Sequence, residues 1–140
     1  MESNALFHLA FPVTNLKIAK QFYGDLLGCA QGRSTELWVD FNFYGHQIVA
    51  HLVTIPVTVD MTNKVDGDDV PIPHFGAILP MEVWQALADK LSVAGVAFII
   101  KPHLRFQGQV GEQANMFFRD PFGNALEFKA FQDTKQIFEA

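Results

Sequence analysis

Two segments of this chain begin alike, and each carries a histidine at the corresponding place. The first is the apolar run Ala5–Val13, which contains His8, and the second begins at His74. Sliding the first segment onto the second superposes the two histidines. A slide of one residue more superposes the helix-like runs that follow, so that Gly28 falls on Gly95. This half-chain repeat predicts two similar modules with a pseudo-symmetric site built from both.

Length and composition limit what the chain can be. Its 140 residues suit one domain, and the 49% of hydrophobic residues are enough for a buried core. The net charge of -5 argues against a nucleic-acid-binding surface. We find no signal peptide and no apolar run near the roughly 18 residues of a membrane span. The lone Cys29 excludes an internal disulfide and favours a reducing compartment, so we expect a cytoplasmic protein without nucleic-acid or membrane partners.

The repeat predicts a β-α-β-β-β order in each half, and local patterns identify three strands of the first half and four of the second. In the first half we predict a strand at 5–13, a helix from Asn15 that Gly28 ends, and strands at 37–43 and 47–55. In the second half we predict strands at 74–79, 97–100, 113–119 and 125–131, a helix at 81–94 and a loop at 101–111. The acidic, turn-rich stretch between them is interpreted as a linker. The prediction is therefore one α+β domain over 1–140, with module one at about 5–55, the linker at about 56–73 and module two at about 74–131.

Strand alternation separates the side chains of each repeat into two faces, because successive residues point to opposite sides. His8 and Ala10 share one face of the first strand, and His74 and Gly76 share the corresponding face in the second half. The alternate positions are mostly large and apolar. We expect the helices to cover the apolar faces on the outside and the histidine faces of a curved mixed sheet to surround a metal site.

Three side chains form the candidate metal site, namely His8, His74 and Glu127. Glu127 interrupts an apolar strand, where a carboxylate is costly unless it is paired or binds a metal. Two imidazoles and one carboxylate make the facial triad of non-haem Fe(II) oxygenases, which leaves positions for a bidentate substrate and O₂. His51 lies in the strand that closes the first half, and its position suits either a fourth ligand or a catalytic base.

The repeat, the strand histidines and the segment Asp120–Glu127 (DPFGNALE) resemble the vicinal oxygen chelate superfamily. That superfamily includes glyoxalase I, bleomycin and fosfomycin resistance proteins, methylmalonyl-CoA epimerase and extradiol dioxygenases. The resemblance covers essentially the whole chain. With the segments Phe7–Val13, Gly45–His51 and Val110–Gln113, the chain is most similar to small bacterial proteins described as predicted extradiol dioxygenases. The resemblance implies a homodimer, whose modules pair within one chain or between chains.

The resemblance also implies that the metal positions hold His8, His51, His74 and Glu127. In ring-cleaving members the second of these positions is not a ligand, and a histidine of that region is the base. In glyoxalase-like members the same position supplies a fourth ligand. The sequence departs from the extradiol signature at Phe117, where that signature has a tyrosine, and it lacks the histidine expected upstream.

These observations favour a metal-dependent enzyme with a small-molecule substrate. The first expectation is an Fe(II) extradiol-type dioxygenase for a catechol-like ring, in which His51 takes a proton. The alternative is a glyoxalase- or epimerase-like isomerase or lyase that uses one Ni, Co, Zn or Mn ion. A second alternative is a non-catalytic protein that binds a small molecule such as an antibiotic. Candidate substrate-binding residues are Phe117, Asp40 and Asn42.

Overall fold

The computed structural model describes residues 4–55, 61–65 and 67–139. These residues group into two compact units, and each unit is described by itself. The N-terminal unit holds the described residues up to residue 55 together with the turn Pro121–Asn124, and the C-terminal unit holds the others. No helix in these ranges is long and apolar enough to cross a membrane.

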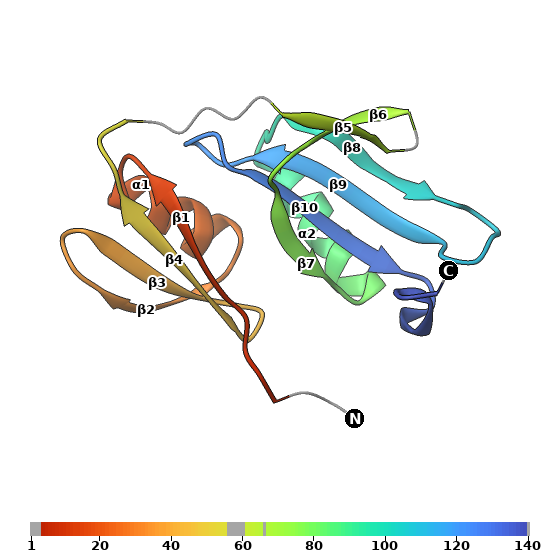
Figure 1. Ribbon diagram of the computed structural model, residues 1–140, viewed down its shortest axis with the longest axis horizontal. Helices are drawn as coiled ribbons and strands as arrows, with labels where there is room; N and C mark the ends of the chain where they lie inside the picture. Colours follow the sequence, from red (N-terminus) through yellow and green to blue (C-terminus); the bar gives the residue numbers. More distant parts are fainter. Residues whose placement is uncertain (1–3, 56–60, 66, 140) are drawn as a thin grey trace. The chain divides into compact units, whose positions relative to one another are not determined.

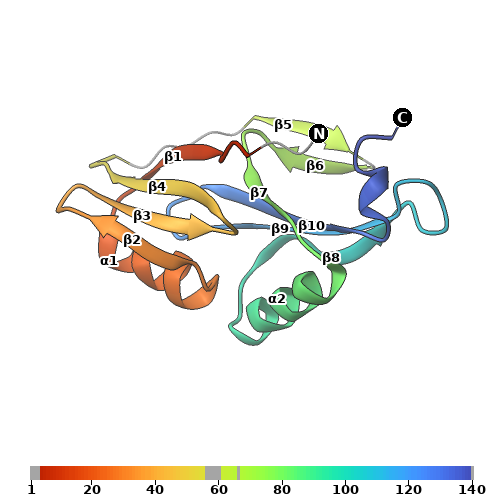
Figure 2. The same ribbon diagram turned by 90° about the horizontal axis from the view of Figure 1, so that it is seen from below.

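The N-terminal unit is a four-stranded sheet with a helical segment on one face (Figures 1 and 2). Its elements are β1 (His8–Val13), α1 (Leu16–Ala19), a π-helical turn η1 (Lys20–Leu26), β2 (Ala30–Ser34), β3 (Trp38–Phe43) and β4 (His46–Leu52). The strand order is β1-β4-β3-β2, with β1 parallel to β4 and the other pairs antiparallel. The Asn15 side chain caps the helical segment by accepting a hydrogen bond from the backbone N–H of Ile18.

The C-terminal unit repeats this plan. Its repeated elements are β7 (Phe75–Ile78), α2 (Met81–Val93), β8 (Phe98–Arg105), β9 (Gln113–Arg119) and β10 (Ala125–Phe131), followed by a short 3₁₀ helix η2 (Thr134–Gln136). The strand order is β7-β10-β9-β8, with β7 parallel to β10 and the other pairs antiparallel. The same order and the same single parallel pair in both units confirm the α+β fold with two β-α-β-β-β repeats.

Aromatic side chains fill the layer between each sheet and its helix. In the N-terminal unit the ring centroid of Tyr23 lies 5.0 Å from that of Phe11 and 5.6 Å from that of Phe41. In the C-terminal unit the indole N–H of Trp84 donates to the carbonyl of Phe128 at 2.9 Å, which fastens α2 to β10. The side chains that alternate with these apolar residues point to the opposite face of each sheet, as the sequence pattern predicts.

Part of the segment that the sequence assigns to the linker forms a hairpin of the C-terminal unit. The strands β5 (Thr62–Val65) and β6 (Asp68–Pro71) pair antiparallel, whereas residues 56–60 and 66 lie outside the described residues. Val70 of β6 is 3% exposed and forms a cluster with Ile100 and Phe117. The hairpin depends on these contacts with distant strands, which the short polar sequence does not reveal.

The strand β8 continues to Arg105, so the predicted loop is wrong for residues 101–105. The register with β9 shifts between Ile100 and His103, around Pro102, which cannot donate a ladder hydrogen bond and so disguises the strand in the sequence. At its end, the buried Arg105 guanidinium donates to the Val65 carbonyl at 3.2 Å and to a carboxylate oxygen of Asp68 at 3.1 Å. These bonds tie the hairpin to β8.

Candidate metal centre

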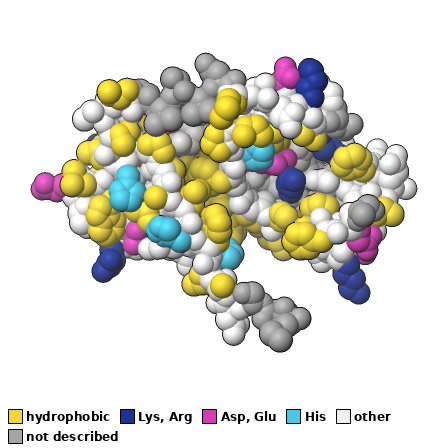
Figure 3. Space-filling model, viewed as in Figure 1, with side chains coloured by type: hydrophobic (Ala, Val, Ile, Leu, Met, Phe, Trp, Pro, Cys, Tyr) yellow, Lys and Arg dark blue, Asp and Glu magenta, His cyan; other side chains and the backbone are white. Residues whose placement is uncertain are grey.

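In the C-terminal unit an imidazole and a carboxylate face each other. His74 directly precedes β7, and Glu127 lies in β10 opposite Gly76. The Nε2 atom of His74 is 3.4 Å from the Oε1 atom of Glu127, whose side chain is 9% exposed. Both residues line an open cavity of about 220 Å³. On this unit, Figure 3 shows a histidine side chain (cyan) beside acidic (magenta) and basic (dark blue) side chains.

The second nitrogen of His74 decides what its Nε2 atom can do. The Nδ1 atom lies 2.6 Å from the carbonyl oxygen of Pro71. A carbonyl only accepts hydrogen bonds, so Nδ1 carries a proton and donates it. In the neutral ring the Nε2 lone pair therefore faces the carboxylate of Glu127, which is repulsive. A proton or a metal cation between the two atoms removes this repulsion, so the pair suits metal ligation.

The same geometry shifts both pKa values in the metal-free chain. The hydrogen bond with Glu127 raises the pKa of His74 above its ordinary 6.5, although partial burial opposes the change. Burial by itself would raise the pKa of Glu127, but hydrogen bonds from His74 and Asn115 and the nearby charge of Lys129 bring it below its ordinary 4.5. Both shifts favour the charged forms, an imidazolium next to a carboxylate, in the metal-free pair.

Two further side chains hold Glu127 in place. Asn115 Nδ2 donates to Glu127 Oε2 at 2.9 Å, which leaves Oε1 for His74, and Lys129 Nζ lies 3.7 Å from Oε1. Asn115 is 1% exposed, and its Oδ1 atom has no hydrogen-bond partner in the described part of the chain. Sequence reasoning missed both residues. Strand alternation could have found Lys129, because it shares the strand face of Glu127. Asn115 is found only from the register of the β9–β10 hairpin, in which it pairs with Lys129.

Phe117 lies on the same face of the C-terminal sheet as Glu127, where the β5–β6 hairpin covers it. It pairs with Glu127 in register and is 1% exposed. The centroid of its ring lies 4.9 Å from that of the His74 ring, and the two rings are arranged edge to face. Phe117 also packs with Val70 and Ile100 in a buried cluster. Phe117 therefore supports His74 from the side, and a substrate-binding role for it stays a prediction.

In the N-terminal unit, His8 and His51 lie on the exposed face of the sheet. His8 pairs with Gln47 between β1 and β4, and its Nδ1 atom is 2.7 Å from Gln47 Oε1. His51 lies four residues after Gln47 in β4. In the strand register it is opposite Pro12 of β1 on one side and Trp38 of β3 on the other. Its side chain makes no hydrogen bond to the described residues, so both of its nitrogens are accessible to a ligand or a proton.

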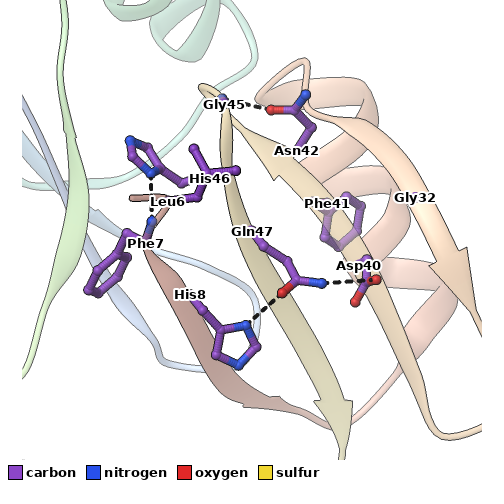
Figure 4. A pocket seen from close by; sticks show the side chains of 10 residues that line it. All are labelled: Leu6, Phe7, His8, Gly32, Asp40, Phe41, Asn42, Gly45, His46 and Gln47. Carbon is purple, nitrogen blue, oxygen red and sulfur yellow. Dashed lines mark hydrogen bonds between the residues drawn. The ribbon is translucent and has the colours of Figure 1, made fainter. Parts of the chain in front are cut away.

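A second cavity, of about 420 Å³, lies beside His8 in this unit (Figure 4). Asp40 and Asn42, the predicted substrate-binding residues of β3, both line it. Asn42 Oδ1 accepts a hydrogen bond from the backbone N–H of Gly45 at 2.7 Å, so this atom holds the β3–β4 turn. Asp40 Oδ2 accepts one from Gln47 Nε2 at 3.3 Å. Gln47 is a further residue that the sequence did not single out.

The four donors that the sequence predicts are divided between the units, with His8 and His51 in one and His74 and Glu127 in the other. Among the described residues, no group of three or more His, Cys, Asp or Glu side chains is gathered as a metal site. The donors nevertheless fit a divalent metal chemically. His8 and His74 each have an oxygen acceptor at Nδ1, which is how proteins usually orient a histidine ligand through Nε2.

The shifted pKa values predict how the metal-free pair contributes to stability. The contribution of His74, whose pKa is raised, is fully present below pH 6.5 and is lost as the pH rises through its folded-state pKa. That of Glu127, whose pKa is lowered, is present above pH 4.5 and is lost as the pH falls through its folded-state pKa. We expect His74→Gln to destabilise the protein most between these values. Urea denaturation with a chelator present, repeated across pH, measures the difference, and a difference independent of pH would contradict the pairing.

Comparisons with known proteins identify the family and the fold of the chain. The family model described as the Glyoxalase/Bleomycin resistance protein/Dioxygenase superfamily matches residues 5–128. A protein of that description from Alicyclobacillus acidocaldarius has a similar structure, with a TM-score of 0.79 and 30% sequence identity over 96% of this chain and 97% of the other. The comparison with curated proteins gives no match.

Two more distant structures share the fold. A fosfomycin resistance protein from Listeria monocytogenes has a TM-score of 0.70 at 16% identity, over 96% of this chain and 98% of its own. A lactoylglutathione lyase from Agrobacterium tumefaciens has a TM-score of 0.65 at 14% identity, over the full length of both chains. At these identities the likeness concerns the fold.

Proposed function

This chain belongs to the glyoxalase/bleomycin resistance protein/dioxygenase superfamily, and we propose that it is a metal-dependent enzyme for a small substrate with two adjacent oxygen atoms. The observation that carries the proposal is the His74–Glu127 pair. Its Nε2 and Oε1 atoms face each other at 3.4 Å, while Nδ1 donates to the Pro71 carbonyl. This arrangement of a lone pair opposite a buried carboxylate favours a cation.

His8, His74 and Glu127 would hold one divalent metal. When bound, the metal supplies a Lewis acid that polarises the substrate oxygens. Asn115 keeps Glu127 Oε1 turned toward His74, and the Pro71 carbonyl keeps the His74 ring in its tautomer. A resting proton on His74 is displaced when the metal binds, so metal affinity falls as the pH falls.

The first candidate reaction is Fe(II)-dependent cleavage of a catechol-like ring. Two imidazoles with one carboxylate are the donor set of non-haem Fe(II) oxygenases. His51 is the residue we assign to accept a proton from a substrate hydroxyl. Its exposed ring, without a hydrogen bond to the described residues, is accessible for that step.

The second candidate is a metal-dependent isomerase or lyase, in which His51 is a fourth ligand and the ion is Ni, Co, Zn or Mn. A specific observation favours it, namely that Phe117 stands where the extradiol signature has a tyrosine. A phenylalanine beneath Val70 and beside His74 offers no proton or hydrogen bond to a ring-cleavage reaction.

A non-catalytic binding protein needs an aromatic cleft but no facing metal ligands, so the His74–Glu127 pair disfavours it.

We also propose that the protein is a homodimer with one domain per chain and that it is cytoplasmic. The single cysteine, Cys29, which is buried, supports the cytoplasmic setting.

Electron paramagnetic resonance of the Fe(II)-loaded protein with nitric oxide tests the proposal. We expect a high-spin iron-nitrosyl signal that His74→Ala abolishes. A signal that shifts when catechol is added supports ring cleavage. Iron that gives no nitrosyl signal, or one indifferent to catechol, supports the isomerase or lyase. A wild-type protein that binds no divalent metal overturns the enzyme proposal.

A further inference from the structure

Three side chains on the exposed face of the N-terminal sheet form a hydrogen-bonded chain that ends at His8. Asp40 in β3, Gln47 in β4 and His8 in β1 come from three neighbouring strands (Figure 4). Gln47 Nε2 is 3.3 Å from Asp40 Oδ2, and Gln47 Oε1 is 2.7 Å from His8 Nδ1. All three residues line the 420 Å³ cavity of this unit.

The chemistry of this chain permits only one direction. A carboxylate has acceptors alone, so the Gln47 amide must turn its NH₂ group toward Asp40. Its carbonyl oxygen is then the atom that faces His8. A carbonyl oxygen accepts and never donates, so His8 must carry its proton on Nδ1. The Nε2 atom of the neutral ring is left with its lone pair.

The neighbouring His46 shows that this tautomer is not a general property of the unit. Its Nδ1 atom accepts a hydrogen bond from the backbone N–H of Phe7 at 2.9 Å. The neutral ring of His46 therefore carries its proton on Nε2, opposite to His8. His74 in the other unit matches His8, because its Nδ1 atom donates to the Pro71 carbonyl. A side-chain carbonyl at His8 and a backbone carbonyl at His74 thus select the same tautomer at the two histidines that the repeat relates.

We propose that Gln47, oriented by Asp40, is a positioning residue that fixes the tautomer and the ring orientation of His8 and so presents Nε2 as a metal ligand. The inference rests on the proposed function, since Nε2 needs a metal to bind. It assigns Gln47 a role in metal binding without contact to the metal. It also gives Asp40 a task other than substrate binding.

The expected size of the effect follows from other metal sites. Loss of an outer hydrogen-bond partner of a ligating histidine typically lowers metal affinity about 10–100-fold. Gln47→Leu removes both hydrogen bonds at similar side-chain size. Gln47→Glu keeps an acceptor toward His8 Nδ1 but sets a second carboxylate against Asp40. It is therefore combined with Asp40→Asn, whose NH₂ group can donate to the new carboxylate, and we expect this double variant to retain the tautomer and most of the affinity.

The first measurement is made without metal. Long-range ¹H–¹⁵N spectra of the histidine rings distinguish Nδ1–H from Nε2–H when the rings are neutral. In the wild-type protein we expect Nδ1–H for His8 and Nε2–H for His46, which serves as a reference in the same spectrum. In Gln47→Leu we expect His8 to move toward Nε2–H, the form that free histidine prefers in water, while His46 stays unchanged.

The second measurement is the Zn²⁺ affinity of the full chain by competition with a chelator. We expect Gln47→Leu to weaken binding about 10–100-fold and the double variant Asp40→Asn with Gln47→Glu to keep most of the affinity. Gln31→Leu is the matched control, because it makes the same change at an exposed residue of β2 on the same sheet. It is expected to bind as the wild type does.

The outcomes separate this inference from the function on which it rests. If the wild-type chain binds no metal, the proposed function is wrong. If it binds metal but His8 is already Nε2–H, or Gln47→Leu binds Zn²⁺ as tightly as the wild type, the role of Gln47 is wrong and the proposed function stands. A changed tautomer and a weakened affinity in Gln47→Leu, together with an affinity that the double variant retains, support both.

Discussion

Replacing Gly76 by alanine is expected to destabilise the C-terminal unit strongly. A Cβ atom at Gly76 would collide with the main-chain carbonyl of Glu127 across the β7–β10 pair. The obstacle is backbone, so no side-chain rotation relieves it. The two strands must separate at the point that carries the candidate ligand. Overpacking usually costs about 1–3 kcal/mol, and we expect a cost near the upper end, with a fall in Tm on the order of 10 °C.

Gly24→Ala is the control for this prediction. A Cβ atom there would lie 3.9 Å from the Cys29 carbonyl oxygen and 4.0 Å from Phe41, which are ordinary contact distances. It lies in a helical segment, where alanine is preferred to glycine, so Tm should stay the same or rise slightly. Thermal denaturation of the three proteins with a chelator present is the measurement. If Gly76→Ala melts with the wild type, the close approach of β7 to β10 is not as described.

The repeat made much of the fold predictable. Two strands that begin alike and two helical patterns ending at Gly28 and Gly95 were enough to predict the β-α-β-β-β units. The parallel pairing of the first and last strand in each unit follows the same plan in both halves. Periodicity works for a strand such as β3, in which buried residues alternate with more exposed ones. It fails for β2, whose residues are all exposed and which the local patterns did not predict.

What the sequence did not reveal depends on strand register and distant packing. Gln47 gains its role because it pairs with His8 across neighbouring strands, and Asn115 gains its role because it donates to Glu127 across the β9–β10 hairpin. The hairpin over Phe117 is held by contacts with β8, and its own residues are mostly polar. Pro102 lies within β8, and a proline in a sequence argues against a strand, so the sequence did not predict that β8 continues to Arg105. In each case the decisive partner is far away in the chain, so local patterns carry little information about it.

The candidate ligands illustrate the same distinction. Glu127 was identifiable because a carboxylate in an apolar strand needs a partner. The structure adds that the partner in the metal-free chain is the imidazole ring of His74, with Lys129 nearby. A sequence pattern names donors, whereas the choice between Oε1 and Oε2, or Nδ1 and Nε2, is made by neighbouring hydrogen bonds.

Glu127→Gln is expected to abolish metal binding while the fold survives. The amide oxygen of the new side chain can accept the hydrogen bond from Asn115, and its NH₂ group can donate to Nε2 of neutral His74. Every polar group of the pair is then satisfied, so Tm should change little at a pH above the raised pKa of His74, where the ring is neutral in both proteins. The NH₂ group, however, occupies the place where a cation is needed. We expect metal affinity to fall by more than the roughly 100-fold upper limit typical of outer-shell partners.

Lys129→Gln is the matched control, because it also replaces a charged residue with glutamine on the same strand face. Its Nζ atom lies 3.7 Å from Glu127 Oε1 and repels a cation there, so removing it should leave metal affinity unchanged or raise it severalfold. Chelator competition with Zn²⁺ measures affinity, and thermal denaturation of the metal-free proteins monitors the fold. Opposite effects of the two substitutions are the signature of a ligand next to a competing charge. Equal metal affinity in Glu127→Gln and the wild type would remove Glu127 from the metal site.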